Sequence, residues 1–264
     1  MKTEAMHQKT VMITGASSGI GLGCAEVFAE AGARLILLAR RRERLHELAA
    51  RLHDLHGTET CTVECDVRYR AAATAAVESL PDEWSAIDVL INNAGLSRGL
   101  DKFQTGSIDD WEEMIDANIK GLLYITRAAL PGMIARAGGV IINIASVAGR
   151  IMYPAGNVYC ATKAAVKAIS DSLQLDVNGT GVRVCNIDPG LVETEFSLVR
   201  FHGDVGRAAS VYRGFTPLSG RDVAEAALFC ATRPKHVSIH DLLIMPTAQA
   251  SPYVIAKQEV SQKF

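Results

Sequence analysis

Short apolar runs alternate with amphipathic segments along nearly the whole chain. The runs are rich in Val, Ile and Leu, as in TVMIT (10–14), ARLILLA (33–39) and GGVIINIAS (138–146). Runs with so few polar positions are typical of parallel strands that are buried on both faces. The intervening segments show helical spacing, as in RRERLHELAARLHDLHG (41–57), which ends in glycine. The pattern therefore predicts strands and helices in regular alternation.

This alternation predicts one α/β domain over residues 1–264. We expect strands within residues 10–14, 33–39, 60–67, 87–95, 138–146, 182–190 and 241–246. After the helix that follows the first strand, we expect helices at 41–57, 70–80, 109–137 with Ser107 as its N-cap, 155–178 and 221–232. Right-handed crossovers then give a doubly wound parallel sheet, a Rossmann fold, with helices on both faces.

Two segments depart from the alternation. A polar segment at about 191–220 follows the sixth strand, and a polar tail occupies about 247–264. In a doubly wound sheet, ligands bind beyond the carboxyl ends of the strands. The segment at 191–220 starts at that edge, so we expect it to cover the ligand and call it the lid.

Composition narrows the class of protein. The chain has 264 residues, 48% of them hydrophobic, which suits a single α/β domain. A formal net charge of −2 gives no basic footprint for nucleic acid. There is no uncharged apolar run long enough for a membrane span, and the polar N-terminus is unlike a signal peptide. The six cysteines form no CxxC pair, so we expect reduced cysteines and a cytoplasmic protein.

A glycine-rich turn, TGASSGIG (14–21), joins the first strand to the first helix. Gly15 permits a tight turn, and Gly21 allows close packing of helix and strand. At Gly19 the backbone can approach a pyrophosphate, which the free N–H groups and the helix dipole attract. Any tight turn can hold glycines, but the position between the first strand and the first helix favours a dinucleotide site.

The end of the second strand indicates which dinucleotide binds. An NAD site usually has Asp or Glu there, bonded to the 2′-hydroxyl group of the ribose. This chain has Ala39 followed by Arg40 and Arg41. Guanidinium groups bind a 2′-phosphate in bidentate fashion, so the sequence favours NADP(H). The alternative is an arginine-rich first turn of a solvated helix, although arginine is unfavourable at a helix N-terminus.

Several further motifs occur in a fixed order at strand ends and on helix faces. They are Asp66, NNAG (92–95), Asn118, Ser146, Tyr159-x3-Lys163 and DPG (188–190). With these motifs the chain resembles the short-chain dehydrogenase/reductase family over essentially its whole length. The resemblance implies an oxidoreductase that acts on CH–OH groups with a nicotinamide cofactor.

The resemblance also implies which residues bind the cofactor, in addition to Arg40 and Arg41. Four groups of residues are implied, and they would contact the phosphates, the adenine, the ribose and the nicotinamide in turn. In that order they are Gly15, Ser17, Ser18 and Ile20; Asp66 and Val67; Asn93, Ala94 and Gly95; and Pro189, Gly190, Val192 and Thr194, with Tyr159 and Lys163 at the reacting end.

Tyr159 and Lys163 lie four positions apart and share a helix face. A nearby cation lowers the pKa of a phenol, so we expect Lys163 and the oxidised nicotinamide to lower that of Tyr159. Tyr159 then exchanges a proton with the substrate oxygen as a general acid or base. The resemblance implies that Ser146 orients this oxygen and that Asn118 holds a water linking Lys163 to solvent.

The sequence defines the substrate less well. The stretches 188–204 and 242–252 resemble the NADP-dependent 3-hydroxy acid dehydrogenase subgroup, near which sulfoacetaldehyde reductases lie. This resemblance implies a short 3-hydroxy acid or 2-hydroxy sulfonate. Arg150 is a candidate for its anionic group, or else a surface or subunit-contact residue. The polar lid, with Arg200 among its charged residues, favours a small anion over a long apolar substrate.

Alternatives to this function stay open. The first alternative is a sulfoacetaldehyde reductase that forms isethionate, and the second is a broad carbonyl or sugar reductase. The third, a remote one, is an NADP-binding sensor without catalysis. The seven histidines are scattered, so we expect no metal. We expect neither a membrane nor a nucleic acid as partner. The resemblance implies a homotetramer that assembles through the helices at 109–137 and 155–178.

Overall fold

Seven parallel strands form the central sheet of the computed structural model, which describes residues 6–258. The strands lie in the order β3-β2-β1-β4-β5-β6-β7. The order reverses beside β1, and the crevice at such a reversal is where doubly wound sheets bind ligands. The strands are β1 (Thr10–Thr14), β2 (Arg34–Ala39), β3 (Thr60–Glu64), β4 (Val89–Asn92), β5 (Gly139–Ile144), β6 (Val182–Pro189) and β7 (Asp241–Ile244).

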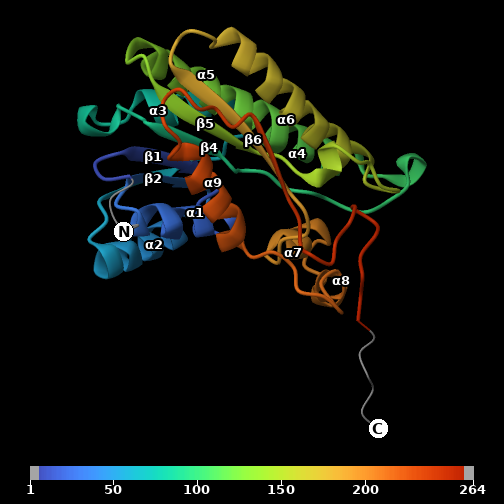
Figure 1. The fold of residues 1–264 in the computed structure, drawn as a ribbon. Coiled ribbons are helices and arrows are strands. Elements are labelled where there is room, and N and C mark those ends of the chain that lie inside the picture. The colour runs from blue at the N-terminus through green and yellow to red at the C-terminus, as the bar shows by residue number, and fades with distance from the viewer. Residues whose placement is uncertain (1–5, 259–264) are drawn as a thin grey trace.

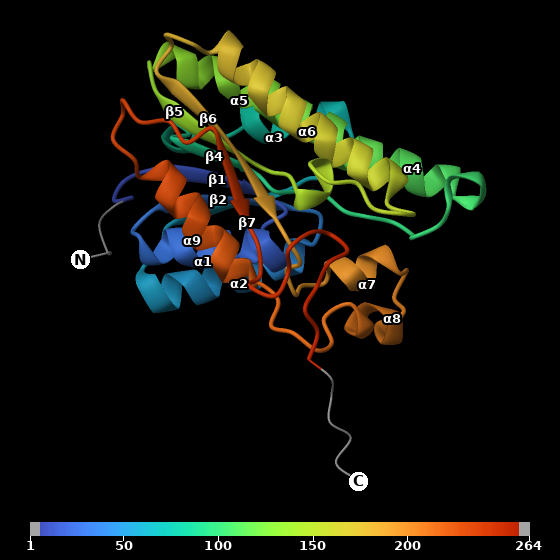
Figure 2. The ribbon, with the colours of Figure 1, turned by 45° about the vertical axis from the view of Figure 1, so that its right-hand side comes forward.

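Helices cover both faces of this sheet (Figure 1). One face carries α1 (Gly19–Glu30), α2 (Arg42–His56) and α9 (Gly220–Ala231). The other carries α3 (Arg70–Glu78), α4 (Ile108–Ile115), α5 (Leu122–Ala135) and α6 (Asn157–Asp176). The turned view in Figure 2 shows that α7 (Phe196–Arg200) and α8 (Val205–Ser210) lie away from both layers. Short helical turns complete the connections: η1 (Asp82–Trp84), η2 (Phe103–Thr105) and η4 (Val147–Gly149).

Successive residues of the central strands are buried on alternate faces of the sheet. In β1, Val11 and Ile13 pack with α1, α2 and α9, whereas Met12 packs with α3 and α5. In β2, Leu35 packs on the same face as Val11 and Ile13, and Ile36 packs on the same face as Met12. Burial on both faces explains the apolar runs and confirms the predicted doubly wound fold.

The helix predicted at 109–137 is interrupted. Ser107 is its N-cap as predicted, because its side chain accepts a hydrogen bond from the Asp110 amide. α4 then ends at Ile115, and a π-helical turn, η3 (Asp116–Gly121), separates it from α5. Such turns insert an extra residue and often mark functional sites. The predicted catalytic residue Asn118 lies inside this one.

The lid is partly helical, since α7 and α8 lie within it. Its two ends meet in a bridge between Val192 and Leu218. The tail also contacts the lid, because the Gln249 side chain accepts a hydrogen bond from the Leu191 amide at 2.8 Å. Of the predicted domain and its tail, residues 1–5 and 259–264 lie outside the described residues. None of the helices between residues 6 and 258 is long and apolar enough to cross a lipid bilayer.

Candidate active site

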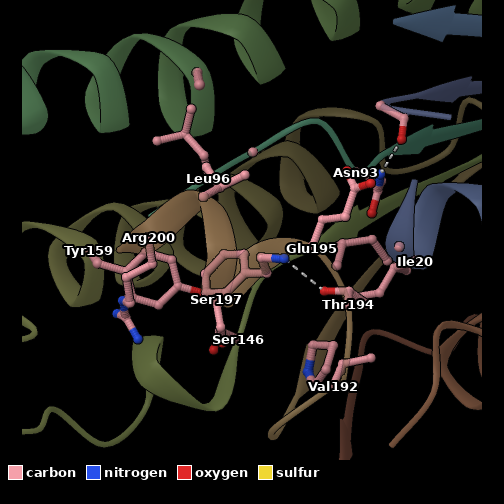
Figure 3. Close-up of a pocket in the computed structure, with 18 of the residues that line it drawn as sticks. Ile20, Asn93, Leu96, Ser146, Tyr159, Val192, Thr194, Glu195, Ser197 and Arg200 are labelled. Carbon is pink, nitrogen blue, oxygen red and sulfur yellow. Dashed lines mark hydrogen bonds between the residues drawn. The ribbon is translucent and has the colours of Figure 1, made fainter. Parts of the chain in front are cut away.

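A cavity of about 530 Å³ lies along the carboxyl ends of the strands. It extends from the glycine loop to the lid, and Figure 3 shows part of its lining. Every residue predicted to bind the cofactor lines it: Gly15, Ser17, Ser18, Ile20, Arg40, Arg41, Asp66, Val67, Asn93, Ala94, Gly95, Tyr159, Lys163, Pro189, Gly190, Val192 and Thr194. The fold thus brings these separate segments together around one cavity.

The glycine loop fits a phosphate group. Gly15 has a φ of +69°, and a Cβ at Gly21 would lie 2.3 Å from the Gly15 carbonyl oxygen. Side chains at these two positions would strain or block the loop. α1 begins at Gly19, and its N-cap Ser18 makes no side-chain hydrogen bond to the helix amides. The first amides of α1 therefore receive no cap from Ser18, as suits a helix end that binds an anion.

The loop is fixed to the end of β4. The Asn93 amide Nδ2 donates to the Thr14 carbonyl at 2.9 Å. In return, Thr14 Oγ1 accepts from the backbone amides of Asn93 and Ala94 at 3.0 and 2.9 Å. These bonds hold the carboxyl ends of β1 and β4 together, and they give NNAG a role in shaping the cavity.

Two arginines follow β2 at the far end of the cavity. Arg41 donates from Nε and Nη2 to the Ser17 hydroxyl oxygen at 3.3 and 3.2 Å. Its Nη1 donates to Glu195 of the lid at 2.8 Å. Arg40 is exposed and also lines the cavity. Two cations at the end of β2 fit the predicted phosphate-bearing ribose.

The catalytic candidates meet at the other end, on and beside α6. Tyr159 and Lys163 are 8% and 6% exposed. The Ser146 side chain lies close enough to the Tyr159 phenol to lower the pKa of that phenol, against the effect of burial. Lys163 Nζ donates to the Ile144 carbonyl at 2.9 Å. The structure thus places Ser146, Tyr159 and Lys163 together in the cavity lining, as expected from the sequence.

Burial dominates the pKa of both groups. Burial raises the pKa of Tyr159 above its usual range, against opposing effects of Arg200 and of the Ser146 side chain. Burial lowers the pKa of Lys163 to about 8, although the Asp188 carboxylate opposes this. Lys163 by itself therefore does not lower the pKa of Tyr159 below its usual range. Desolvation of the phenolate outweighs the nearby positive charge.

Asn118 lies behind the cavity wall rather than in it. Its Oδ1 accepts from the Leu96 amide at 2.8 Å, and its Nδ2 donates to the Leu96 carbonyl at 2.9 Å. Nδ2 also donates to Thr162 Oγ1 on α6 at 3.0 Å. The π-helical turn therefore joins the loop after β4 to α6. The water relay through Asn118 stays a prediction.

Arg150 is placed differently from the expectation. It is absent from the cavity lining, and its Nε donates to the buried Asp188 carboxylate at 2.6 Å. It also pairs with Asp241 on β7. Asp188 Oδ1 accepts from the Ser146 amide at 3.2 Å. A buried carboxylate requires a counter-charge, so Arg150 supports the strand that holds Ser146 and does not face the substrate space.

Arg200, unlike Arg150, lines the cavity beside Tyr159. Its guanidinium carbon lies 5.1 Å from the centroid of the Tyr159 ring. Nε donates to Ser97 Oγ at 3.0 Å, and Nη2 donates to the Tyr153 hydroxyl. Among residues 6–258 no carboxylate forms an ion pair with it. Its charge was visible in the sequence, but the irregular lid gave no periodicity from which to predict its direction.

Comparisons with known proteins define the class. The sequence model of the short chain dehydrogenase family matches residues 9–202. The NADP-dependent 3-hydroxy acid dehydrogenase of Escherichia coli K12 is 48% identical over 241 residues, 91% of this chain and 96% of that protein. Its namesake from Schizosaccharomyces pombe is 44% identical over 252 residues, 95% of this chain and 97% of that protein. The chain belongs to the short-chain dehydrogenase family.

Solved structures agree with this assignment. The closed form of a serine dehydrogenase complexed with NADP+ has a TM-score of 0.88 and 46% identity, with 95% of this chain and 100% of that one covered. An L-sorbose reductase from Gluconobacter frateurii, complexed with NADPH and L-sorbose, has a TM-score of 0.79 and 30% identity, with 92% and 97% covered.

Proposed function

We propose that this chain is an NADP(H)-dependent oxidoreductase that interconverts a short 3-hydroxy acid, or a 2-hydroxy sulfonate, with its carbonyl form. Family membership and the 3-hydroxy acid dehydrogenases among its relatives support the reaction class. One observation supports an anionic substrate: Arg200 lies beside Tyr159 in the cavity and, within residues 6–258, has no carboxylate partner. A partly buried cation in such a place favours a carboxylate or sulfonate ligand.

The chain's own residues suit this cofactor. The glycine loop would hold the pyrophosphate, Arg40 and Arg41 the 2′-phosphate, and Asp66 with Val67 the adenine. Asn93, Ala94 and Gly95 would contact the ribose, and the residues Pro189, Gly190, Val192 and Thr194 would cover the nicotinamide. When bound, the nicotinamide supplies the hydride for reduction or accepts it in oxidation.

Tyr159 moves the proton in this mechanism. Its raised pKa keeps the phenol protonated at neutral pH, which is the form that donates a proton to a carbonyl oxygen. The Ser146 hydroxyl would donate a hydrogen bond to the same oxygen and polarise it. Arg200 would hold the anionic end of the substrate and so fix the carbonyl between these two hydroxyl groups. In oxidation the substrate hydroxyl group would give its proton to the phenolate form of Tyr159, which is the form that proton donation leaves.

A neutral carbonyl compound is the second candidate substrate. The similarity to an L-sorbose reductase favours it, because that protein is complexed with a neutral sugar. The two candidates differ in what Arg200 does. A sulfonate such as sulfoacetaldehyde belongs to the first class, since its charge lies at a similar distance from its carbonyl group.

A substrate panel with three variants tests the proposal. NADPH oxidation is measured with sulfoacetaldehyde and with malonate and methylmalonate semialdehydes, and NADP+ reduction with serine, allo-threonine and 3-hydroxybutyrate. Tyr159→Phe should lower kcat about 10²- to 10⁴-fold, as expected for loss of a general acid, while NADPH binding by fluorescence persists. Absence of turnover on every small anion would contradict the proposal.

Arg200→Gln tests the anionic group separately. It should lower kcat/KM about 10- to 100-fold for 3-hydroxybutyrate, because a charge-assisted hydrogen bond contributes about 1.5–3 kcal/mol. The neutral 3-hydroxybutyramide and L-sorbose should change little. Arg213→Gln, an exposed lid arginine outside the cavity, is the matched control. Equal losses on charged and neutral substrates would favour the second candidate.

A further inference from the structure

Glu195 joins the lid to the arginine-rich start of α2. It is the residue before α7 and lines the cavity. Its Oε2 lies 2.8 Å from Arg41 Nη1, and its Oε1 lies 2.6 Å from Arg44 Nη1. The hydrogen bonds from Arg44 and Arg41 hold the pKa of Glu195 below its usual range, so the carboxylate is charged at neutral pH. A lid residue thus occupies Arg41, one of the two cations that the sequence assigned to the cofactor.

Arg41 has little hydrogen-bonding capacity left in this arrangement. Nε and Nη2 donate to Ser17, and Nη1 donates to Glu195. Arg40 makes no hydrogen bond to another residue in the range 6–258. A 2′-phosphate at the end of β2 would therefore find Arg40 open and Arg41 already shared with a carboxylate. Phosphate and carboxylate are both anions, and they compete for the same guanidinium nitrogen.

The lid is close enough for this competition to involve the glycine loop. A Cβ at Gly19 would lie 3.3 Å from the Cβ of Thr194, the neighbour of Glu195. Arg44 lies on the first turn of α2, three positions after the N-cap residue Arg41, and both arginines contact Glu195. Glu195 can therefore keep one ion pair with Arg44 when Arg41 turns to the phosphate, and the base of the lid stays in place.

We propose that Glu195 is a specificity-determining residue for the phosphate of the cofactor. It competes with the 2′-phosphate for Arg41, and Arg44 holds it aside when the phosphate binds. The carboxylate thereby limits the affinity for NADP(H) and has little effect on NAD(H), which lacks this phosphate. This inference rests on the proposed NADP(H) cofactor and is independent of the substrate.

Binding of 2′,5′-ADP tests the competition without turnover, because this ligand carries the phosphate and lacks the nicotinamide. Isothermal titration calorimetry at low and moderate salt would compare the wild type with Glu195→Gln. The variant should bind 2′,5′-ADP and NADP+ about 3- to 10-fold more tightly, and NAD+ unchanged within about twofold. Glu193→Gln is the matched control, since this exposed lid carboxylate lies outside the cavity and its removal changes the net charge equally.

Arg44 separates this mechanism from a general effect of charge. Arg44→Gln should weaken 2′,5′-ADP binding, because Glu195 then depends on Arg41 alone. In the Glu195→Gln background the same substitution should have a clearly smaller effect. If the two effects simply add, or if Glu195→Gln leaves binding unchanged or weakens it, Glu195 does not compete with the phosphate.

The wild-type measurements test the proposed cofactor separately from the proposed competition by Glu195. A wild-type protein that binds NAD+ more tightly than NADP+ and does not bind 2′,5′-ADP would contradict the proposed cofactor itself. A wild-type protein that prefers NADP+, with no gain in the Glu195 variant, would overturn only the competition.

Discussion

At the scale of single residues, burial shifts the pKa values of a phenol and an ammonium group in the cavity lining in opposite directions. Burial raises the pKa of Tyr159 and lowers that of Lys163 to about 8. Desolvation disfavours the charged form in both cases. The folded protein therefore carries Lys163 at a cost in stability, and this cost is the price of a cation beside the reacting atoms.

Removing that charge should stabilise the cofactor-free protein. The pKa of Lys163 in the folded protein, about 8, lies below the ordinary lysine value of 10.5, so between these values the unfolded chain binds more protons. Stability of the wild type must then rise with pH in this window, and the penalty is complete below pH 8. Lys163→Met should thus gain up to about 3 kcal/mol at pH 7, with the gain shrinking toward pH 10.5.

Denaturation in urea at several pH values measures this gain. Lys167→Met on the same helix is the control, because Lys167 pairs with Asp171 nearer the surface and should give no such gain. The Lys163 variant should also lose activity. A Lys163 variant that is less stable than the wild type at pH 7 would show that its bond to the Ile144 carbonyl outweighs the cost of burial.

The residue scale also shows where the sequence was informative. The glycine loop and the Tyr159–Lys163 pair were predictable, because their spacing has a geometric meaning within one local element. The sequence left Arg150 open between a substrate contact and a surface or subunit-contact residue, since its partner Asp188 lies on β6 and this pairing is a tertiary property. Arg200 was not assigned, because the direction of a side chain in an irregular lid depends on the whole fold.

At the scale of elements, the catalytic helix α6 is fixed by close backbone packing. A Cβ at Gly149, in η4, would lie 2.6 Å from the Lys163 carbonyl oxygen and from its carbon. η4 directly follows its N-cap Ser146, so this contact sets the distance between the segment after β5, which holds Ser146, and the helix that holds Tyr159. The sequence predicted the strand at 138–146 and the helix at 155–178 but not the contact between η4 and α6. The π-helical turn at Asn118 was not predicted, because it is not visible in the spacing of the apolar residues.

Gly149→Ala should therefore separate the catalytic groups. The methyl group meets backbone atoms, which cannot move aside as a flexible side chain would, so η4 or α6 must shift. We expect a loss of about 1–3 kcal/mol in stability, typical of overpacking, and a fall in kcat larger than any change in NADPH affinity. Thermal melting and steady-state kinetics measure the two effects. Gly138→Ala is the control, since nothing lies within 4 Å of the Cβ it adds; equal effects at both positions would contradict the packing argument.

At the scale of the whole molecule, the layered fold followed from the sequence because burial on both faces leaves a clear mark on every central strand. The position of the lid did not follow, since its contacts with the glycine loop and the tail join distant parts of the chain. These contacts make the cavity a property of the whole molecule. The lid lines one end of the cavity through Glu195, beside Arg41, and the other end through Arg200, beside Tyr159, so one segment contributes to both ends.

The outer face of α4, α5 and α6 leads to a last prediction at this scale. Apolar side chains are exposed along it, including Ile108 at 58%, Leu123 at 41% and Leu175 at 78%. Exposed apolar surface of this kind marks an interface, and the family resemblance implies a tetramer through these helices.

Light scattering after size-exclusion chromatography should give four copies of the 28.3 kDa chain, about 113 kDa. Leu123→Arg should dissociate this assembly, because burying an unpaired charge in an interface is costly, whereas Leu55→Arg on α2, which is more exposed at 66% and lies on the opposite layer, should not. A monomer for the wild type, or a tetramer that persists in the Leu123 variant, would exclude this face as the interface.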